Sequence, residues 1–211
     1  MTMTDQTTNN NTTDKTPLPH EPVLPSECSN VLFTSSEILS RVSELAQQIS
    51  TYYSTILQPN EPLVLIPVLS GSYQFASDLS RKLTVPCTID FMALSSYSDS
   101  TKSSGEVKIL MDTKQSIHNK HVLILEDIID SGWTVQFLER LLATRRPASL
   151  KSCVLLTAPK HKRRVESVID FVGFDIGEKF VVGYGLDLAS RHRNLPYIAE
   201  LKQEVIDSFT K

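Results

Sequence analysis

The chain has 211 residues, of which 40% are hydrophobic and 21% charged, and its formal net charge is -3. At about 100 to 200 residues per domain, this length fits one globular domain, alone or with an appendage, and the composition excludes a disordered or fibrous protein. The small negative charge argues against nucleic acid as a partner, because a broadly basic surface is needed to neutralise many phosphates.

The cysteine pattern indicates the compartment. Cys28, Cys87 and Cys153 are odd in number, far apart and without C-x-x-C spacing, so neither a disulfide framework nor a thiolate zinc site is predicted. No apolar run reaches the ~20 residues that a membrane helix requires, and the first residues match no secretory signal. We therefore expect a cytoplasmic protein without a membrane partner.

Residues 1–28 differ in composition from the rest of the chain. They are rich in Thr, Asn, Asp and Pro, and such a segment cannot bury enough apolar surface to offset the entropy lost on ordering. We predict a disordered tail at residues 1–28, without a role of its own, and a folded domain at residues 29–211.

The folded part begins with a helix signal. Thr34 and Glu37 have the spacing of a capping box, and apolar residues follow with helical period as far as Ile56. Residues 63–66 are a continuous apolar run typical of a buried parallel strand, and a segment of helical character follows at residues 75–83.

Strand, turn and helix then alternate. Residues 121–125 form a second fully apolar strand, residues 135–143 a helix, and the Ser-rich segment 95–105 a loop. Further strands are predicted at residues 86–94, 107–111, 150–156, 169–174 and 180–184. This alternation predicts an α/β domain with a largely parallel sheet, in which ligands bind beyond the carboxyl ends of the strands.

The most informative residues follow the strand at residues 121–125. The adjacent carboxylates Glu126 and Asp127 can hold a diol or Mg²⁺, and Asp130 comes three residues later. The turn at residues 131–134 offers main-chain N–H groups, two hydroxyls and the positive end of a helix dipole, which together suit one phosphate. The alternative interpretation is a strand end whose acidic residues cap the next helix. No G-x-x-x-x-G-K motif of a nucleoside-triphosphate P-loop is present.

Residues 126–134 resemble the 5-phosphoribosyl-1-pyrophosphate (PRPP) motif of the type I phosphoribosyltransferases, in their hypoxanthine-guanine branch. Stretches at residues 68–72, 96–107 and 170–197 support the same branch, and the resemblance covers residues 31–201. It implies the type I phosphoribosyltransferase fold, an α/β domain with a parallel sheet and a small hood formed by the N- and C-terminal segments.

The resemblance also implies how PRPP is bound. Glu126 and Asp127 would hold the ribose hydroxyls and help place Mg²⁺, and Asp187 would reach a second Mg²⁺ through water. The 5-phosphate would be enclosed by Ile129, Asp130, Ser131, Gly132, Trp133 and Thr134. The pyrophosphate would be bound by Leu69, Ser70, Gly71, Ser96, Tyr97 and Arg193. The loop that carries Ser96 and Tyr97 would close over it and exclude water.

For the purine base, the resemblance implies that Asp130 faces N7 as the catalytic acid-base group. Phe180 would stack on the ring, Val181 would present main-chain groups to its edge, and Ile128 and Asp187 complete the purine-binding set. From the residues alone, Phe180 could instead belong to the core and Arg193 could be a solvated surface charge.

One departure from the family concerns the base. Where relatives commonly read Leu-Leu-Asp-Lys-Pro, with the lysine donating to the purine 6-oxo group, this chain has Ala158 before Pro159. Ala158 cannot donate. Lys160 is the predicted substitute if the loop is remodelled, which the extra residues His161 and Lys162 would permit.

The resemblance therefore predicts a Mg²⁺-dependent purine salvage enzyme, a glycosyltransferase that joins PRPP to hypoxanthine or guanine and releases pyrophosphate. A homodimer or homotetramer is expected. Two alternatives remain open: a relative that prefers xanthine, and a non-catalytic regulator that senses PRPP or nucleotides and binds RNA. The basic run at residues 160–164 is either a solvated loop or the RNA contact of such a regulator.

Overall fold

The computed structural model describes residues 22–96, 107–162, 165 and 169–209. Its larger sheet has the strand order β5-β4-β2-β6-β7-β8, with β3 paired to β2. The strands are β2 (Leu63–Leu69), β3 (Cys87–Ile89), β4 (Met92–Ser96), β5 (Val107–Met111), β6 (His121–Ile129), β7 (Ser149–Thr157) and β8 (Phe171–Asp175). Every pairing in it is parallel except that of β4 with β5. The predicted α/β fold with a largely parallel sheet is confirmed.

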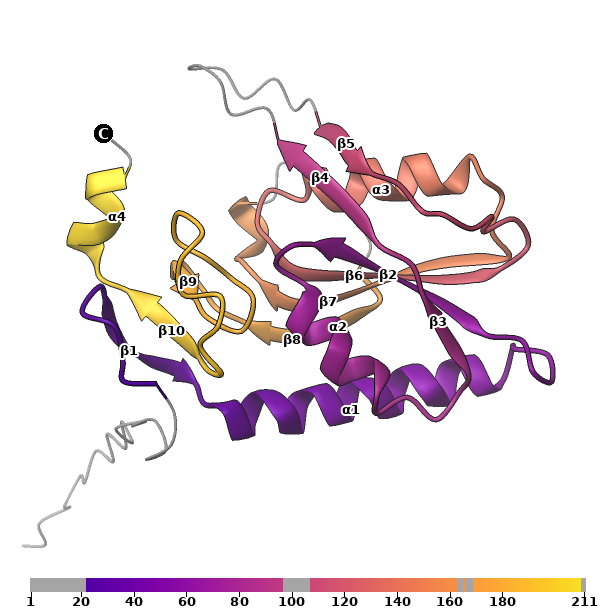
Figure 1. Cartoon of the computed structure of the whole chain (residues 1–211), viewed down its shortest axis with the longest axis horizontal. Coiled ribbons are helices and arrows are strands. Elements are labelled where there is room, and N and C mark those ends of the chain that lie inside the picture. The colour runs from indigo at the N-terminus through magenta and orange to yellow at the C-terminus, as the bar shows by residue number, and fades with distance from the viewer. Residues whose placement is uncertain (1–21, 97–106, 163–164, 166–168, 210–211) are drawn as a thin grey trace, which may run out of the picture.

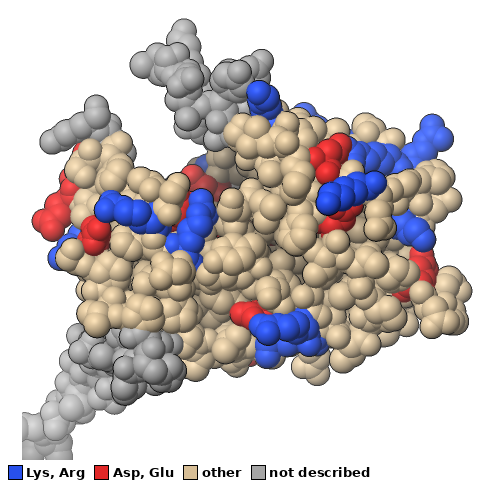
Figure 2. Space-filling view, viewed as in Figure 1, with Lys and Arg blue, Asp and Glu red and all other residues tan. Residues whose placement is uncertain are grey.

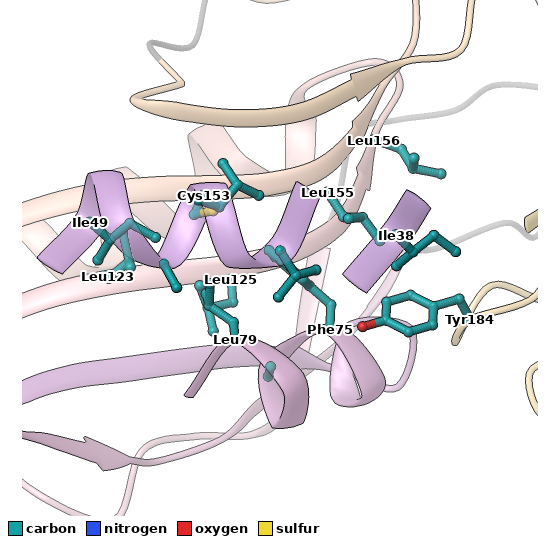
Figure 3. Close-up of a cluster of buried hydrophobic side chains, with 14 of the residues drawn as sticks. Ile38, Ile49, Phe75, Leu79, Leu123, Leu125, Cys153, Leu155, Leu156 and Tyr184 are labelled. Atoms are coloured by element: carbon teal, nitrogen blue, oxygen red, sulfur yellow. The ribbon is translucent and has the colours of Figure 1, made fainter. Parts of the chain in front are cut away.

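Helices cover both faces of this sheet. α1 (Ser35–Ser54) and α2 (Tyr73–Ser80) lie on one face and α3 (Trp133–Ala143) on the other (Figure 1). Side chains alternate along β6, so that Leu123 and Leu125 pack in the cluster on the α1 and α2 face (Figure 3), whereas Val122 and Ile124 pack toward α3. Burial on both faces explains why the strand is an unbroken apolar run.

α1 begins as its sequence predicts. Thr34 Oγ1 accepts a hydrogen bond from the Glu37 N–H, and Glu37 Oε2 accepts one from the Thr34 N–H, which completes the capping box. The buried stripe of the helix is Ile38, Val42, Leu45, Ala46, Ile49, Ser50 and Tyr53. This stripe anchors the long helix along the sheet.

A second, smaller sheet forms a hood beside the carboxyl ends of the large sheet's strands. It contains β1 (Cys28–Phe33), β10 (Ile198–Leu201) and β9 (Val181–Val182), all antiparallel, and is followed by α4 (Gln203–Phe209) (Figure 1). The N- and C-terminal segments therefore build the hood that the family resemblance implies.

Residues 22–28, which the composition assigned to the tail, contact the folded domain. Cys28 is buried in β1, Leu24 packs against the hood cluster, and the Tyr197 hydroxyl donates to the Pro22 carbonyl at 2.9 Å. Composition alone did not reveal these contacts, because their partners come from the far end of the chain. Residues 1–21 of the predicted tail lie outside the described residues.

Several element boundaries differ from those predicted. Residues 86–94 form two strands instead of one, because the chain turns at Asp90, whose carboxylate accepts the N–H groups of Lys114 and Gln115. The strand predicted at residues 180–184 shortens to β9, since Gly183 and Tyr184 have positive φ. β1, β10 and α4 were not predicted at all.

No helix in the described parts of the chain is both long and apolar enough to cross a membrane.

Candidate active site

The two adjacent carboxylates lie within β6, which runs four residues beyond its predicted end. Glu126 is 5% exposed, and its Oε1 has no hydrogen-bond partner among the described residues. Burial raises the pKa of Glu126 well above its ordinary value, and the neighbouring carboxylate of Asp127 adds to the rise. A buried carboxyl oxygen without a partner is costly, which indicates a site for a ligand rather than a structural cap.

Asp127 packs directly on the loop between β2 and α2. A Cβ built on Gly71 would lie 1.6 Å from Asp127 Oδ2, so only glycine fits there. Asp127 Oδ1 accepts the Ile128 N–H at 2.8 Å. Burial raises the pKa of Asp127, and the main-chain hydrogen bond and the guanidinium of Arg193 partly oppose that rise. The loop itself is exposed at Ser70, and the Leu69–Ser70 peptide bond is cis.

The turn of the hood that follows β9 closes on this loop. Gly185 has φ +102°, and a Cβ there would lie 2.0 Å from the carbonyl oxygen of Gly71. Arg193 donates from Nη1 to the Gly185 carbonyl at 2.6 Å, and its Nη2 lies 2.6 Å from Asp187 Oδ1. The fold therefore gathers a guanidinium and two carboxylates around the glycine at residue 71, an arrangement suited to a phosphate group and a cation.

The turn after β6 leads into the start of α3. Gly132 is the N-cap residue in the left-handed region (φ +83°), no side chain caps the helix, and no acidic residue lies in its first turn. The N–H groups at this helix start are thus open to an anion, and the helix dipole favours one. Thr134 is half-buried in the first turn. The side chain of Ile129, by contrast, is in the core, and its carbonyl accepts the Ala158 N–H at 2.9 Å.

A cleft of about 830 Å³ lies between the strand ends and the hood, a volume typical of small-molecule sites. Eight residues predicted for the site line it: Asp127, Ile128, Asp130, Ser131, Trp133, Phe180, Val181 and Asp187. The sequence did not predict the lining residues Ile176, Lys179 and Leu186, and it pointed to His161 and Lys162 only as extra residues of the loop. The first five of the predicted residues come from the end of β6 and the start of α3, and the other three from a distant segment, so the fold joins the two halves.

Comparison with known proteins identifies the family. A model of the phosphoribosyl transferase domain matches residues 32–188. The hypoxanthine-guanine phosphoribosyltransferase of Dictyostelium discoideum is 47% identical over 177 residues, which are 82% of this chain and 96% of that protein. The enzyme of the same description from Mycobacterium tuberculosis is 45% identical over 86% of this chain and 90% of its own length. The chain belongs to the hypoxanthine-guanine branch of the type I phosphoribosyltransferases.

Solved structures agree with this assignment. Trypanosoma cruzi hypoxanthine phosphoribosyltransferase in complex with the product IMP has a TM-score of 0.80 and 43% identity, covering 87% of this chain and all of that one. A structure from a study of the C-terminal region of the same trypanosomal enzyme has a TM-score of 0.82 and 42% identity, covering 90% of this chain and 99% of that one. This phosphoribosyltransferase therefore shares both sequence and fold with its relatives over most of its length.

The end of the cleft near the hood carries the aromatic residue expected for a base. Phe180 is 53% exposed and lines the cleft, so it is not a core residue. The ammonium of Lys162 lies 5.6 Å from the centroid of its ring. Ala158 is buried in the cleft lining. Lys160 begins the short 3₁₀ turn η1 (Lys160–Lys162), and its side chain lies outside the described residues.

The carboxylates also suit a Mg²⁺ ion whose remaining ligands come from a substrate and water. Among the residues that the structure describes, no three His, Cys, Asp or Glu side chains form a metal cluster. Mg²⁺ typically takes one or two protein carboxylates together with substrate phosphates and waters. The unpartnered Oε1 of Glu126, with Asp127 beside it, is a donor set of that kind.

Part of the predicted pyrophosphate site lies outside the described residues. Tyr97 belongs to the segment 97–106, and Ser96 ends β4 with its side chain outside the description. The predicted closing loop therefore lies outside the described residues. Leu69, Ser70 and Gly71 form the end of β2 and the adjacent turn, which contacts Asp127 and Gly185 as described above.

Proposed function

We propose that this phosphoribosyltransferase joins PRPP to hypoxanthine or guanine, forming IMP or GMP and releasing pyrophosphate. The observation that carries the proposal is the single cleft in which Asp127, Asp130 and the start of α3 face Phe180 and Val181. An uncapped helix start and an exposed aromatic ring thus line one cavity, which supports binding of a phosphate and a planar base there. The names of the curated relatives and the IMP complex of the trypanosomal enzyme support the same substrates.

The two ends of PRPP would be held by different elements. The open N–H groups at the start of α3 bind the 5-phosphate, with the Thr134 hydroxyl as an additional donor. Carboxylates accept hydrogen bonds from ribose hydroxyls, the role we assign to Glu126 and Asp127. Arg193 would exchange part of its contact with Asp187 for the pyrophosphate, because a guanidinium binds phosphate oxygens in a bidentate manner.

Asp130 is the proposed catalytic residue. It is exposed, lines the cleft and follows directly after β6. As the bond from purine N9 to the anomeric carbon forms and the bond from that carbon to the pyrophosphate oxygen breaks, the Asp130 carboxylate accepts the proton that leaves N7. General base catalysis of this kind contributes about 10²- to 10⁴-fold in rate.

We propose Mg²⁺ as the cofactor, with Glu126, Asp127 and Asp187 as the residues that would hold it. Bound Mg²⁺ supplies positive charge that stabilises the departing pyrophosphate. The protein's own contribution is the buried carboxylate pair, whose pKa values are raised by burial, so that a bound cation would favour their charged forms.

A spectrophotometric assay tests the proposal. PRPP is supplied with hypoxanthine, guanine, xanthine or adenine, with Mg²⁺ or with EDTA. We expect turnover of hypoxanthine and guanine, loss of activity in EDTA, and a kcat at least 100-fold lower in Asp130→Asn with a much smaller change in the KM for PRPP. Faster turnover of xanthine would favour the xanthine-preferring alternative.

The regulator alternative predicts a different outcome, in which the protein binds PRPP with Mg²⁺ but turns over none of the four bases. The charge distribution does not favour it, because Lys and Arg are interspersed with Asp and Glu on the face shown in Figure 2. That face offers no broad basic surface to a nucleic acid.

We also propose that the enzyme is a cytoplasmic homodimer or homotetramer. A study of the trypanosomal relative concerns the effect of its C-terminal region on oligomeric state and activity. In this chain, α4 has no buried residue among those described, and Phe209 is 53% exposed. Light scattering of the full chain and of a chain ending at residue 202 would test whether α4 contributes to assembly, and cell fractionation would test the compartment.

A further inference from the structure

The family resemblance implies a cationic donor to the base at the position of Ala158, where this chain has none, and the structure offers a substitute. We propose that the Lys162 ammonium donates to the 6-oxo group of the purine and so determines which bases are used. This inference rests on the proposed function, because it assumes that a purine stacks on Phe180.

The first argument is position. Lys162 and Ala158 line the same cleft as Phe180 and Val181. The turn that carries Lys162 is closed by a hydrogen bond from its own N–H to the Pro159 carbonyl at 3.0 Å, and with this turn formed Lys162 lines the cleft. The turn thus places an ammonium in the same cleft as Ala158, which cannot donate a hydrogen bond from its side chain.

The second argument is distance. Lys162 Nζ lies 5.6 Å from the centroid of the Phe180 ring. A purine stacked on that ring has its edge atoms within a few ångströms of the same centroid, and the flexible four-carbon stem of lysine allows the ammonium to adjust by that amount. The ammonium can thus reach a carbonyl at the edge of the base without rearrangement of the main chain.

The third argument concerns the present partner of the ammonium. Lys162 Nζ pairs with Glu178 Oε2 at 2.7 Å, and His161 Nε2 lies 2.7 Å from the other oxygen of the same carboxylate. Glu178 is largely exposed, and an exposed ion pair contributes little to stability. Glu178 therefore orients Lys162 without preventing its contact with a ligand.

Lys179, which also lines the cleft, is placed less favourably for donating to the base. Lys179 Nζ pairs with Glu200 Oε2 at 2.7 Å, on β10 of the hood. The Lys179 ammonium is thus directed to the hood sheet. The Lys162 ammonium, by contrast, lies over the Phe180 ring.

A donor at this position has a chemical consequence. An ammonium offers only donors, so it favours the 6-oxo group of hypoxanthine and guanine and disfavours the 6-amino group of adenine. A site built to donate to a carbonyl discriminates strongly against a base that lacks the acceptor.

The test is Lys162→Met, which keeps the length of the stem and removes the charge. We expect kcat/KM for hypoxanthine and guanine to fall about 10-fold or more, the KM for PRPP to stay within about twofold, and the preference for hypoxanthine over adenine to narrow. Lys120→Met, at an exposed lysine before the opposite end of β6, is the matched control. Unchanged use of hypoxanthine in Lys162→Met, or a loss that appears instead in Lys160→Met or Lys179→Met, would overturn the proposal.

A binding experiment separates this inference from the proposed reaction. Trp133 is the single tryptophan of the sequence and lines the cleft, so its fluorescence can report titrations with IMP and AMP without turnover. Wild-type protein should prefer IMP, and Lys162→Met should lose most of that preference. An absence of turnover with this preference intact would reject only the reaction, whereas equal affinity for IMP and AMP would reject the role of Lys162.

The double variant Lys162→Met with Ala158→Lys provides a rescue. It should regain use of 6-oxopurines, because the lysine then stands at the position where the family resemblance implies the donor. A well-folded double variant that remains as weak as Lys162→Met would show that Lys162 acts by supporting the loop and not by donating to the base.

Discussion

The contact between Gly71 and Asp127 supports a quantitative prediction for Gly71→Ala. The new Cβ would lie 1.6 Å from Asp127 Oδ2 and 2.4 Å from its Cγ, whereas ordinary contact begins at 3.4 Å. The carboxylate must therefore move by roughly 1.8 Å, or the loop between β2 and α2 must move instead. Either movement displaces a group that we assign to PRPP.

Two effects of different size follow. Overpacking at a buried site costs about 1 to 3 kcal/mol, and at about 2 to 4 °C per kcal/mol for a chain of this size the Tm should fall by about 2 to 12 °C. A displacement of about 1 Å in a reacting assembly can cost about 100-fold in rate. We therefore expect kcat/KM for PRPP to fall by about 100-fold, measured at saturating hypoxanthine.

Gly177→Ala separates the loss of stability from the loss of function. Gly177 has φ +61° and no atom within 4 Å of a built Cβ, so alanine there adds backbone strain of about 1 to 2 kcal/mol without a clash. Thermal melts and initial rates of both variants are compared. If Gly71→Ala lowers Tm but keeps the KM and kcat of Gly177→Ala, the contact with Asp127 has no part in PRPP binding. An unchanged Tm would refute the packing argument itself.

Three further predictions concern the phosphate turn, the buried carboxylate and the N-terminal segment. Thr134→Ala should raise the KM for PRPP severalfold, because one hydroxyl contact to a charged group is lost while the main-chain donors remain; an unchanged KM would remove Thr134 from the site. Glu126→Gln should weaken PRPP binding yet raise the Tm of the unliganded protein at pH 8. The raised pKa of Glu126 means that the folded state holds its proton more tightly, so wild-type stability falls as pH rises above the ordinary value of 4.5, and the variant should lack this decline; parallel pH profiles of the two Tm values would contradict it. Deletion of residues 1–21 should leave Tm within about 1 °C, whereas deletion of residues 1–25 also removes the acceptor of the Tyr197 hydroxyl, worth about 1 kcal/mol, and should lower Tm by about 2 to 4 °C. Equal melting temperatures for the two truncated chains would show that this contact is not stabilising.

The sequence by itself determined those features that depend only on residues close together along the chain. The capping box of Thr34 and Glu37 specified where α1 begins, and the apolar runs around Leu65 and Leu123 specified strands buried on both faces. The succession of carboxylates, glycine turn and helix at residues 126–134 was also readable, because its parts are contiguous and the turn places its donors locally. Interactions of this kind require no knowledge of the rest of the fold.

Only the tertiary structure decided how the site is assembled. Asp127 packs on Gly71, Gly185 packs on the same loop, and Arg193 pairs with Asp187 across a turn that no sequence pattern predicted. The hood strands β1 and β10 pair across almost the whole described chain, and neither has a turn signal linking it to its partner. Contacts between residues so far apart depend on where the intervening elements pack.

The part of the cleft proposed to bind the purine base shows most clearly what the sequence could not predict. The sequence pointed to a missing donor at Ala158 and to Lys160 as its substitute, but the position of the Lys162 ammonium over Phe180 depends on the path of the inserted turn and on Glu178. The path of a loop is set by what it packs against, and its sequence neighbours do not contain that information. Residue types in the pocket were thus readable from the chain, whereas the distances between their side chains follow from the packing of the hood against the strand ends.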